Sequence, residues 1–353
     1  FHSGIQLMIQ KAATALWVLA IGTMLNSGLA SPPDLDLTPK TQIWEIGVRI
    51  KAQGGFVSGI EATLPFPQDW PEQKTELLSV EKSDHIGGVS FRELGEGARQ
   101  WRILMPRLAA HQEAQIAARV KITRYQVNPP TDPLNWHRPK RLSSKLKVYL
   151  QPSPYIESGH RLIKAAGNQA LDGAAKEDWR QVEAIYDWVR SKVKYEFDRE
   201  IRSSLAALKN EKGDCEELTS LFIAICRSQK IPARAVWVPG HCYPEFYLEN
   251  KSGEGRWFPC QAAGDRDFGG IQEWRPILQK GDRFKVPGKS GWQRYVAETL
   301  RAKAAQAEPE VEFFRRPVAN KIDDAHREEF FERTSKTRIP VANIKFPSFE
   351  EIK

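Results

Sequence analysis

The segment that most constrains this chain places a cysteine at the start of a capped helix and a histidine at the start of the strand that follows. Asp214 and Glu217 have the spacing of a capping box, so we expect the helix to begin at Cys215. The apolar positions after it recur at helical spacing: Leu218, Leu221, Phe222 and Ile225. His241 then opens a segment that is typical of a strand.

Cys215 and His241 are the residue types that a thiol nucleophile and its imidazole base require. A helix N-terminus favours the thiolate, but only by roughly 0.3–1 kcal/mol, which is less than about one pKa unit. A full thiolate at neutral pH therefore needs a second cation, and His241 is the candidate. The alternative is that Cys215 is a small buried residue without chemistry, because free cysteines are among the most buried residues.

Four segments, taken in order, resemble the transglutaminase-like family. They are the upstream helix with its Tyr195 segment, the Asp-Cys helix, the stretch 231–236, and His241 before Glu245. The resemblance covers roughly residues 155–300. It implies a papain-related fold and a Cys-His-Asp triad, with cysteine peptidase-like or protein-glutamine acyltransferase-like activity.

The third member of the triad differs from the family pattern. In the family an aspartate ends a strand that reads aromatic, apolar, Pro, apolar, Asp, whereas here residues 257–261 place Gln261 at that position. The resemblance therefore assigns the orienting role to Gln261. A neutral amide fixes the imidazole tautomer but stabilises imidazolium less than a carboxylate does. Asp265 and Asp267 follow closely and are the alternative orienting groups.

The strand that begins at His241 is expected to form a hairpin with residues 254–261. If the turn is centred on Lys251, His241 lies opposite Gln261. Because side chains alternate between the faces of a strand, Cys242 then lies opposite Cys260 on the other face. These two cysteines either form a disulfide across the strands or remain buried free thiols.

Spacing and composition argue against several other kinds of site. No two of the four cysteines form a C-x-x-C pair, so we expect no metal site and no cofactor, and Cys226 is interpreted as a core residue. The net charge of +8 is not accompanied by a basic cluster with aromatic stacking positions, so nucleic-acid binding is not predicted. A content of 41% hydrophobic and 27% charged residues is typical of a globular protein.

Residues 1–30 have the pattern of an export signal. Lys11 precedes an apolar run over 12–25, and Ala30 ends a small-residue cleavage site. The mature protein is therefore expected to be secreted or periplasmic, with no stable membrane insertion after cleavage. A catalytic thiol in such a compartment stays reduced more readily when it has no cysteine partner nearby.

The remaining pattern predicts an α+β protein. Alternating apolar residues over 40–150 predict an N-terminal antiparallel β-sandwich, and residues 155–300 would form the catalytic domain, with helices packed on an antiparallel sheet. Residues 301–353 lack a clear core pattern and are expected to be a partly ordered C-terminal extension.

These observations lead to two main hypotheses about function, beside a third, a disulfide-stapled structural protein in which Cys215 would be oxidised. The first is an exported thiol enzyme that acts on peptide or isopeptide amide bonds of a protein or peptide substrate through a Cys-His acyl-enzyme, with hydrolysis favoured over cross-linking. The second, motivated by Gln261, is a catalytically inactive binding or scaffold protein that keeps the fold. The sequence sets no oligomeric state.

Overall fold

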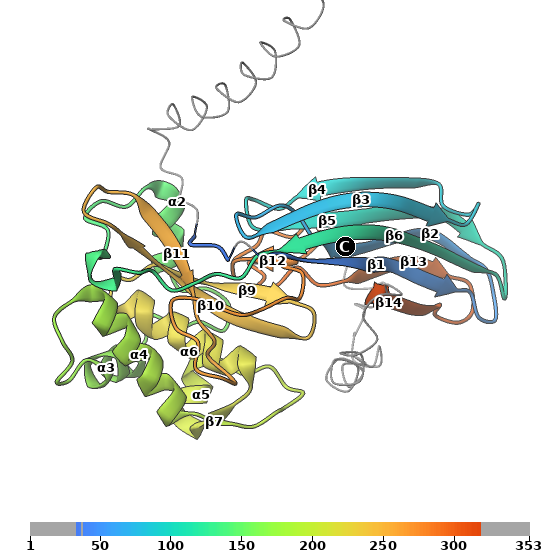
Figure 1. The fold of residues 1–353 in the computed structure, drawn as a ribbon. Coiled ribbons are helices and arrows are strands. Elements are labelled where there is room, and N and C mark those ends of the chain that lie inside the picture. The colour runs from blue at the N-terminus through green and yellow to red at the C-terminus, as the bar shows by residue number, and fades with distance from the viewer. Residues whose placement is uncertain (1–32, 37, 319–353) are drawn as a thin grey trace, which may run out of the picture.

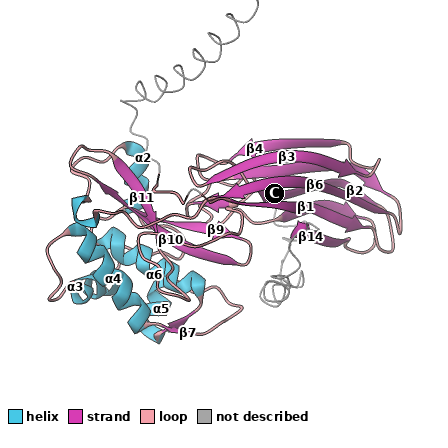
Figure 2. Ribbon diagram, viewed as in Figure 1, coloured by secondary structure: helices cyan, strands magenta, loops and turns pink. Residues whose placement is uncertain are grey.

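The computed structural model describes residues 33–36 and 38–318. Strands alone make up one elongated part of the molecule, and the helices pack beside it against a smaller sheet (Figure 1, Figure 2). The expected signal peptide, residues 1–30, lies outside the described residues. Among the helices of the described ranges, none combines the length and apolar character that crossing a bilayer requires.

The elongated part is a sandwich of two four-stranded antiparallel sheets, with the orders β14-β1-β6-β3 and β13-β2-β5-β4. Alternate side chains of the inner strands β1, β2, β5 and β6 face inward, and apolar residues of both sheets share one buried cluster. Six of the strands come from the region predicted to form a sandwich: β1 (Lys40–Lys51), β2 (Val57–Phe66), β3 (Gln73–Lys82), β4 (Gly88–Glu93), β5 (Arg99–Leu108) and β6 (Glu113–Arg124).

The other two strands of the sandwich come from the end of the described chain. They are β13 (Thr299–Ala304), which pairs with β2, and β14 (Glu310–Val318), which pairs with β1. The structure thus differs from the expected extension over 301–353, because residues up to 318 complete both sheets. Both are edge strands and bury few side chains, which explains their weak hydrophobic pattern. The α+β part is therefore inserted between strands of one sandwich.

The inserted part packs helices against an antiparallel sheet of order β11-β10-β9-β12. Its strands are β9 (Ala233–Val238), β10 (His241–Glu249), β11 (Gly255–Pro259) and β12 (Gln279–Lys280). Its longer helices are α3 (Arg161–Ala170), α4 (Asp178–Lys192), α5 (Ser204–Asn210) and α6 (Cys215–Ser228). The short elements are η1 (Pro133–Asn135), α2 (Ser144–Lys147), η2 (Val148–Leu150), β7 (Lys194–Tyr195) and β8 (Lys212–Gly213).

Helix α6 lies at the centre of this part. Every residue from Glu217 to Arg227 is buried, because the helix contacts β9 and β10 on one side and α3, α4 and α5 on the other. Cys226 is fully buried in this core, as predicted. A helix that is surrounded in this way holds its N-terminus in a fixed place, which a catalytic group requires.

The hairpin of β10 and β11 forms, but two residues away from the expected register. Glu245 pairs with Pro259, so Gln261 does not lie opposite His241. The reason is the turn: the side chain of Asn250 accepts hydrogen bonds from the backbone N–H groups of Ser252 and Glu254, which centres the turn on Ser252 instead of Lys251. A shift of two residues keeps every side chain on its face of the sheet.

The two parts of the molecule are joined by a buried ion cluster. Lys280 of β12 contacts Glu72, beside β3 of the sandwich, and Glu245 of β10, each at 2.5 Å. The second carboxylate oxygen of Glu245 pairs with Arg234 at 2.9 Å. Burial opposes ionisation of Glu72, but the charges of Lys280 and Arg124 outweigh it and hold the pKa of Glu72 below its ordinary value.

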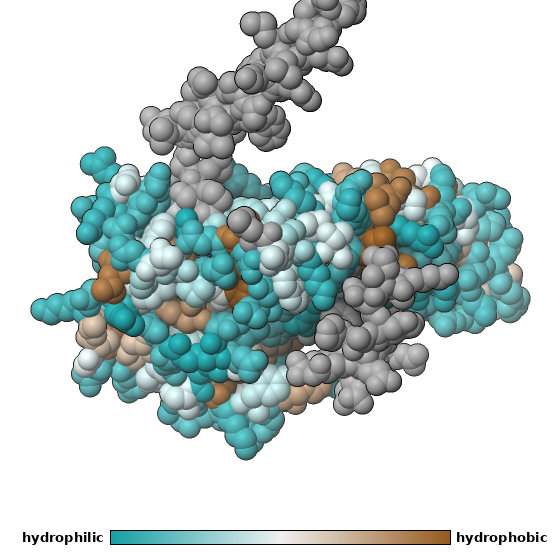
Figure 3. Space-filling model, in the orientation of Figure 1, coloured by the Kyte–Doolittle hydropathy of each residue, from teal (hydrophilic) through white to brown (hydrophobic). Residues whose placement is uncertain are grey.

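The free edges β3 and β4 expose apolar side chains. Brown patches over this edge of the sandwich stand out from a mostly hydrophilic face in Figure 3. The large apolar residues that are exposed on the two strands are Leu77, Leu78, Val80, Val89 and Phe91.

Candidate active site

The first turn of α6 is fixed by the predicted capping box. Asp214 Oδ1 accepts a hydrogen bond of 2.8 Å from the Glu216 N–H, and Glu217 Oε2 accepts one of 2.9 Å from the Asp214 N–H. A side chain at Gly213 would bring its Cβ within 2.4 Å of the Glu217 Cβ, so only glycine permits this close turn. Cys215 is the first helical residue and its side chain is half-buried.

Cys215 lies among hydrogen-bond donors. The thiol of Cys242 donates to the Cys215 carbonyl oxygen, with 3.6 Å between sulfur and oxygen. Hydrogen bonding by Cys242 first, and next hydrogen bonding by His241 and its charge, hold the pKa of Cys215 well below its ordinary value, although burial opposes this. His241, which the sequence suggested as the partner of Cys215, therefore lies close enough to lower the pKa of its thiol.

His241 stands at the first position of β10, where its ring meets the side chain of Gln261. Nε2 of His241 is 2.8 Å from Oε1 of Gln261. An amide oxygen only accepts hydrogen bonds, so Nε2 must carry the proton. Nδ1 is then the nitrogen that can accept a proton from Cys215.

Gln261 is held by helix α4. Its backbone carbonyl accepts hydrogen bonds from the Tyr186 hydroxyl at 2.8 Å and from Arg190 Nη1 at 3.0 Å. Arg190 also donates to the carbonyls of Ala262 and Gly264, which fixes the loop after β11. Sequence reasoning missed Tyr186 and Arg190; their spacing of four residues places them on one helix face but says nothing about their target.

The two alternative orienting groups lie elsewhere in this loop. Asp265 is exposed, and Asp267 is tied by its backbone, whose carbonyl accepts from the Gln261 N–H at 2.8 Å. The ring nitrogen of His241 meets the amide of Gln261 and not a carboxylate. The imidazole is therefore oriented by a neutral group.

A short parallel pair of strands brings a tyrosine to the thiol. β7 pairs with β8 so that Tyr195 lies beside Gly213, two residues before Cys215. Tyr195 keeps 57% of its surface exposed. Partial burial raises its pKa, and the charges of Cys215 and Asp214 add to this. Tyr195 thus carries a neutral hydroxyl at neutral pH and lies near the first turn of α6.

Carboxylates also surround the thiol. Burial, and next the charge of Cys215, raise the pKa of Asp214 to about 8. Glu216 pairs with Arg294 at 3.0 Å, and the Arg294 guanidinium lies 5.1 Å from the ring centroids of Tyr155 and Trp237. The site is therefore rich in groups whose ionisation depends on one another.

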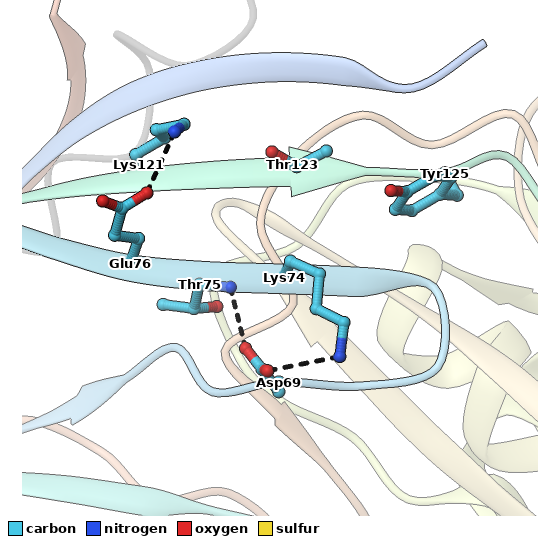
Figure 4. A pocket seen from close by; sticks show the side chains of 7 residues that line it. All are labelled: Asp69, Lys74, Thr75, Glu76, Lys121, Thr123 and Tyr125. Carbon is cyan, nitrogen blue, oxygen red and sulfur yellow. Dashed lines mark hydrogen bonds and ion pairs between the residues drawn. The ribbon is translucent and has the colours of Figure 1, made fainter. Parts of the chain in front are cut away.

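A separate hollow of about 330 Å³ lies on the sandwich (Figure 4). Its charged side chains pair with one another, Lys74 with Asp69 and Lys121 with Glu76. It is distant in the chain from Cys215, and no cysteine or histidine lines it. In the described part of the chain, no group of three or more His, Cys, Asp or Glu is arranged to hold a metal ion.

Comparison with known proteins shows what the segment that carries this site is similar to. Residues 165–262 match the model of the transglutaminase-like superfamily. The structure resembles that of "a Putative Cysteine Protease from Cytophaga hutchinsonii", with a TM-score of 0.51 and 14% identity over 81% of this chain and 95% of that one. The periplasmic domain of TgpA from Pseudomonas aeruginosa bound to ethylmercury matches at a TM-score of 0.30 and 12% identity, over 64% and 90% of the two chains.

No curated protein matches the sequence. The family match includes the helix of Cys215, the strand of His241 and the position of Gln261. The solved structure with the TM-score of 0.51 supports the fold of the whole α+β arrangement. The segment that carries the candidate site thus matches the transglutaminase-like superfamily model.

Proposed function

We propose that this protein is an exported thiol enzyme that cleaves peptide or isopeptide amide bonds through an acyl-enzyme on Cys215. The proposal is supported by the hydrogen bond between His241 Nε2 and Gln261, together with the effect of His241 in lowering the pKa of the Cys215 thiol. A low thiol pKa, an imidazole base and an orienting acceptor are the three parts that such a nucleophile needs.

In this mechanism the Cys215 sulfur attacks the amide carbonyl carbon, and Nδ1 of His241 holds the thiol proton. The carbonyl becomes an oxyanion, for which the backbone N–H of Cys215 and the hydroxyl of Tyr195 are the proposed donors; the pairing of Tyr195 with Gly213 supports the second. His241 then protonates the leaving amine, and the C–N bond breaks to leave a thioester. Water, deprotonated by His241, attacks the thioester and releases the acid and the thiol.

Gln261 favours a second candidate, an inactive binding or scaffold protein. A neutral amide orients the imidazole but does not add the negative charge that stabilises imidazolium. The two candidates differ in the reactivity of Cys215, because a scaffold has no need of a thiolate.

The test uses unfolded casein as a general amide substrate, with and without a fluorescent primary amine. Hydrolysis releases new amino termini, whereas cross-linking incorporates the amine into casein. Cys215→Ala is expected to abolish either reaction while its thermal unfolding resembles that of the wild type. Full activity in Cys215→Ala would contradict the mechanism. No reaction from a wild-type protein whose Cys215 is also slow to alkylate would favour the scaffold.

A further inference from the structure

A second cysteine touches the candidate nucleophile. Cys242 follows His241 directly, so its side chain points to the opposite face of β10, against α6. Its thiol donates a hydrogen bond to the carbonyl oxygen of Cys215, with 3.6 Å between sulfur and oxygen, and hydrogen bonding by Cys242 is the largest cause that lowers the pKa of Cys215. The hydroxyl of Thr219 donates to the Cys242 carbonyl at 3.4 Å, which ties the strand to the helix at this point.

The observed hairpin register explains why these two cysteines meet. With Glu245 opposite Pro259, Cys260 falls beside Pro244, and its backbone N–H donates to the Pro244 carbonyl at 3.0 Å. The expected pairing of Cys242 with Cys260 is therefore wrong, and all four cysteines are free thiols. Cys242 turns instead toward the one half-buried cysteine, while its own side chain is only 1% exposed.

The other two cysteines do not share this environment. Burial raises the pKa of Cys226 and of Cys260 as it does that of Cys242, so it is the bond to the Cys215 carbonyl that sets Cys242 apart. The thiol of Cys260 donates a hydrogen bond to the backbone carbonyl of Pro244, with 3.8 Å between sulfur and oxygen. A reactive thiol and a second thiol thus come together at Cys215 and Cys242.

We propose that Cys242 is a resolving cysteine, which closes a reversible disulfide with Cys215 after a hydroperoxide has oxidised Cys215. The inference rests on the nucleophilic thiolate of the proposed function, and it adds a modification site to it. First, the Cys215 thiolate attacks one peroxide oxygen, the O–O bond breaks, and a sulfenic acid and hydroxide (or an alkoxide) form. Then the Cys242 sulfur attacks the sulfenic sulfur, an S–S bond forms, and water leaves with the Cys242 proton.

The local structure permits the small movement that this bond requires. A disulfide needs its sulfurs about 2.05 Å apart, closer than two hydrogen-bonded sulfurs. Cys242 lies two residues after the tight turn at Gly240, which has a φ of 69°. Pairing of β10 with β11 begins only at Glu245, so at Cys242 the strand is held on one side alone. This end of the strand is therefore the part that can shift toward α6.

The disulfide has a clear consequence for the site. It occupies the sulfur that would attack the amide, so activity stops, and a thiol reductant that attacks the disulfide restores it. It also blocks further oxidation of Cys215 to sulfinic and sulfonic acids, which a reductant does not reverse. The sequence expectation of an isolated Cys215 is thus replaced by a cysteine with a partner that protects it.

The test follows thiols by mass and needs no substrate. The wild type is treated with a small excess of hydrogen peroxide, denatured, alkylated and digested without reductant. We expect the loss of two thiols per chain, a mass lower by two hydrogens, and a linked pair of peptides containing Cys215 and Cys242. Dithiothreitol is expected to restore iodoacetamide labelling of native Cys215.

Two variants sharpen the result. In Cys242→Ser, which changes one atom, Cys215 is expected to gain two or three oxygens, and dithiothreitol does not restore its labelling. Cys260→Ser removes another buried thiol of the same sheet and is expected to behave as the wild type. If Cys242→Ser loses its native thermal transition, the presence or absence of the Cys215–Cys242 linked peptide in the wild type decides the proposal.

The inference is overturned if peroxide drives wild-type Cys215 to sulfinic acid while Cys242 remains a free thiol, or if Cys242→Ser recovers as fully as the wild type. In either case rapid alkylation of Cys215 at pH 6 would leave the proposed enzyme intact. A Cys215 that reacts with neither peroxide nor iodoacetamide would overturn both.

Discussion

Oε1 of Gln261 lies 2.8 Å from Nε2 of His241, although the two residues are not paired in the hairpin. The contact arises because the loop after β11 is held by α4, through the hydrogen bonds of Tyr186 and Arg190 to the Gln261 carbonyl. The orienting group of this site is therefore positioned by a helix far away in sequence. Because the Gln261 amide is neutral, replacing it with alanine and replacing it with a carboxylate should have different effects on activity.

Gln261→Ala is expected to lower kcat by about tenfold to a hundredfold. The variant removes a hydrogen bond to an imidazolium, and such bonds contribute about 1.5–3 kcal/mol. Gln261→Glu should move the upper limit of the pH–rate profile to higher pH, because a carboxylate favours imidazolium. Profiles of kcat/KM against pH measure both effects. The exposed Asp265→Asn is the control; a larger loss there than in Gln261→Ala would transfer the orienting role to Asp265.

Tyr195→Phe tests the hydroxyl beside the sulfur. Loss of an oxyanion donor costs about a hundredfold to a thousandfold in kcat, and KM should change little, because the charge it stabilises exists only in the transition state. Steady-state kinetics on the casein reaction separates the two constants. Tyr125→Phe, on the sandwich, is the matched control. An unchanged kcat in Tyr195→Phe would contradict a role of the Tyr195 hydroxyl in stabilising the oxyanion.

The helix cap at Asp214 links stability to pH. Burial, and next the charge of Cys215, raise the pKa of Asp214 from an ordinary 3.8 to about 8. Its contribution to the free energy of unfolding is therefore fully present below pH 3.8 and is lost as the pH rises through 8. Asp214→Asn keeps a capping side chain and lacks this titration. Urea unfolding across this range should show a decline in the wild type that is missing in Asp214→Asn.

Asp84→Asn, which replaces an exposed aspartate, is the control for this experiment and should follow the wild type. A decline of the same size in Asp214→Asn and in the wild type would show that Asp214 does not titrate in this way.

The buried cluster between the two parts of the molecule should be essential for stability. Lys280→Met leaves the carboxylates of Glu72 and Glu245 without their shared cation, and an unpaired buried charge costs about 3–5 kcal/mol. Urea unfolding measures the loss. Lys121→Met removes an exposed partner of Glu76 and should cost about 1 kcal/mol or less. Equal losses in the two variants would contradict the role of the cluster.

The same cluster predicts weaker stability in acid. Because the pKa of folded Glu72 lies below its ordinary value of 4.5, its contribution is present above pH 4.5 and is lost as the pH falls through the folded pKa. Glu72→Gln should flatten the acid side of the stability profile. A wild-type profile that stays level below pH 4.5 would contradict this.

Local features of the site could be predicted from the sequence. The capping box of Asp214 and Glu217 depends on neighbours in the chain, and the structure confirms it. The face shared by His241 and Gln261 follows from alternation along strands, so it survived an error of two residues in the register. The register differs because the Asn250 side chain accepts hydrogen bonds from the N–H groups of Ser252 and Glu254 and so moves the centre of the turn.

Contacts between distant elements could not be predicted. Cys242 meets Cys215 only because β10 packs against α6, and Arg190 meets Gln261 only because the loop after β11 crosses α4. The strands β13 and β14 were missed because edge strands bury few side chains and so carry little hydrophobic pattern.

The most direct test of the account is the rate at which iodoacetamide alkylates Cys215 as a function of pH. The wild type is expected to react with a midpoint well below the ordinary thiol pKa of about 8.5, and His241→Ala is expected to shift this midpoint upward. A wild-type midpoint at or above the ordinary value, unchanged in His241→Ala, would show that the two groups do not form a nucleophile and its base.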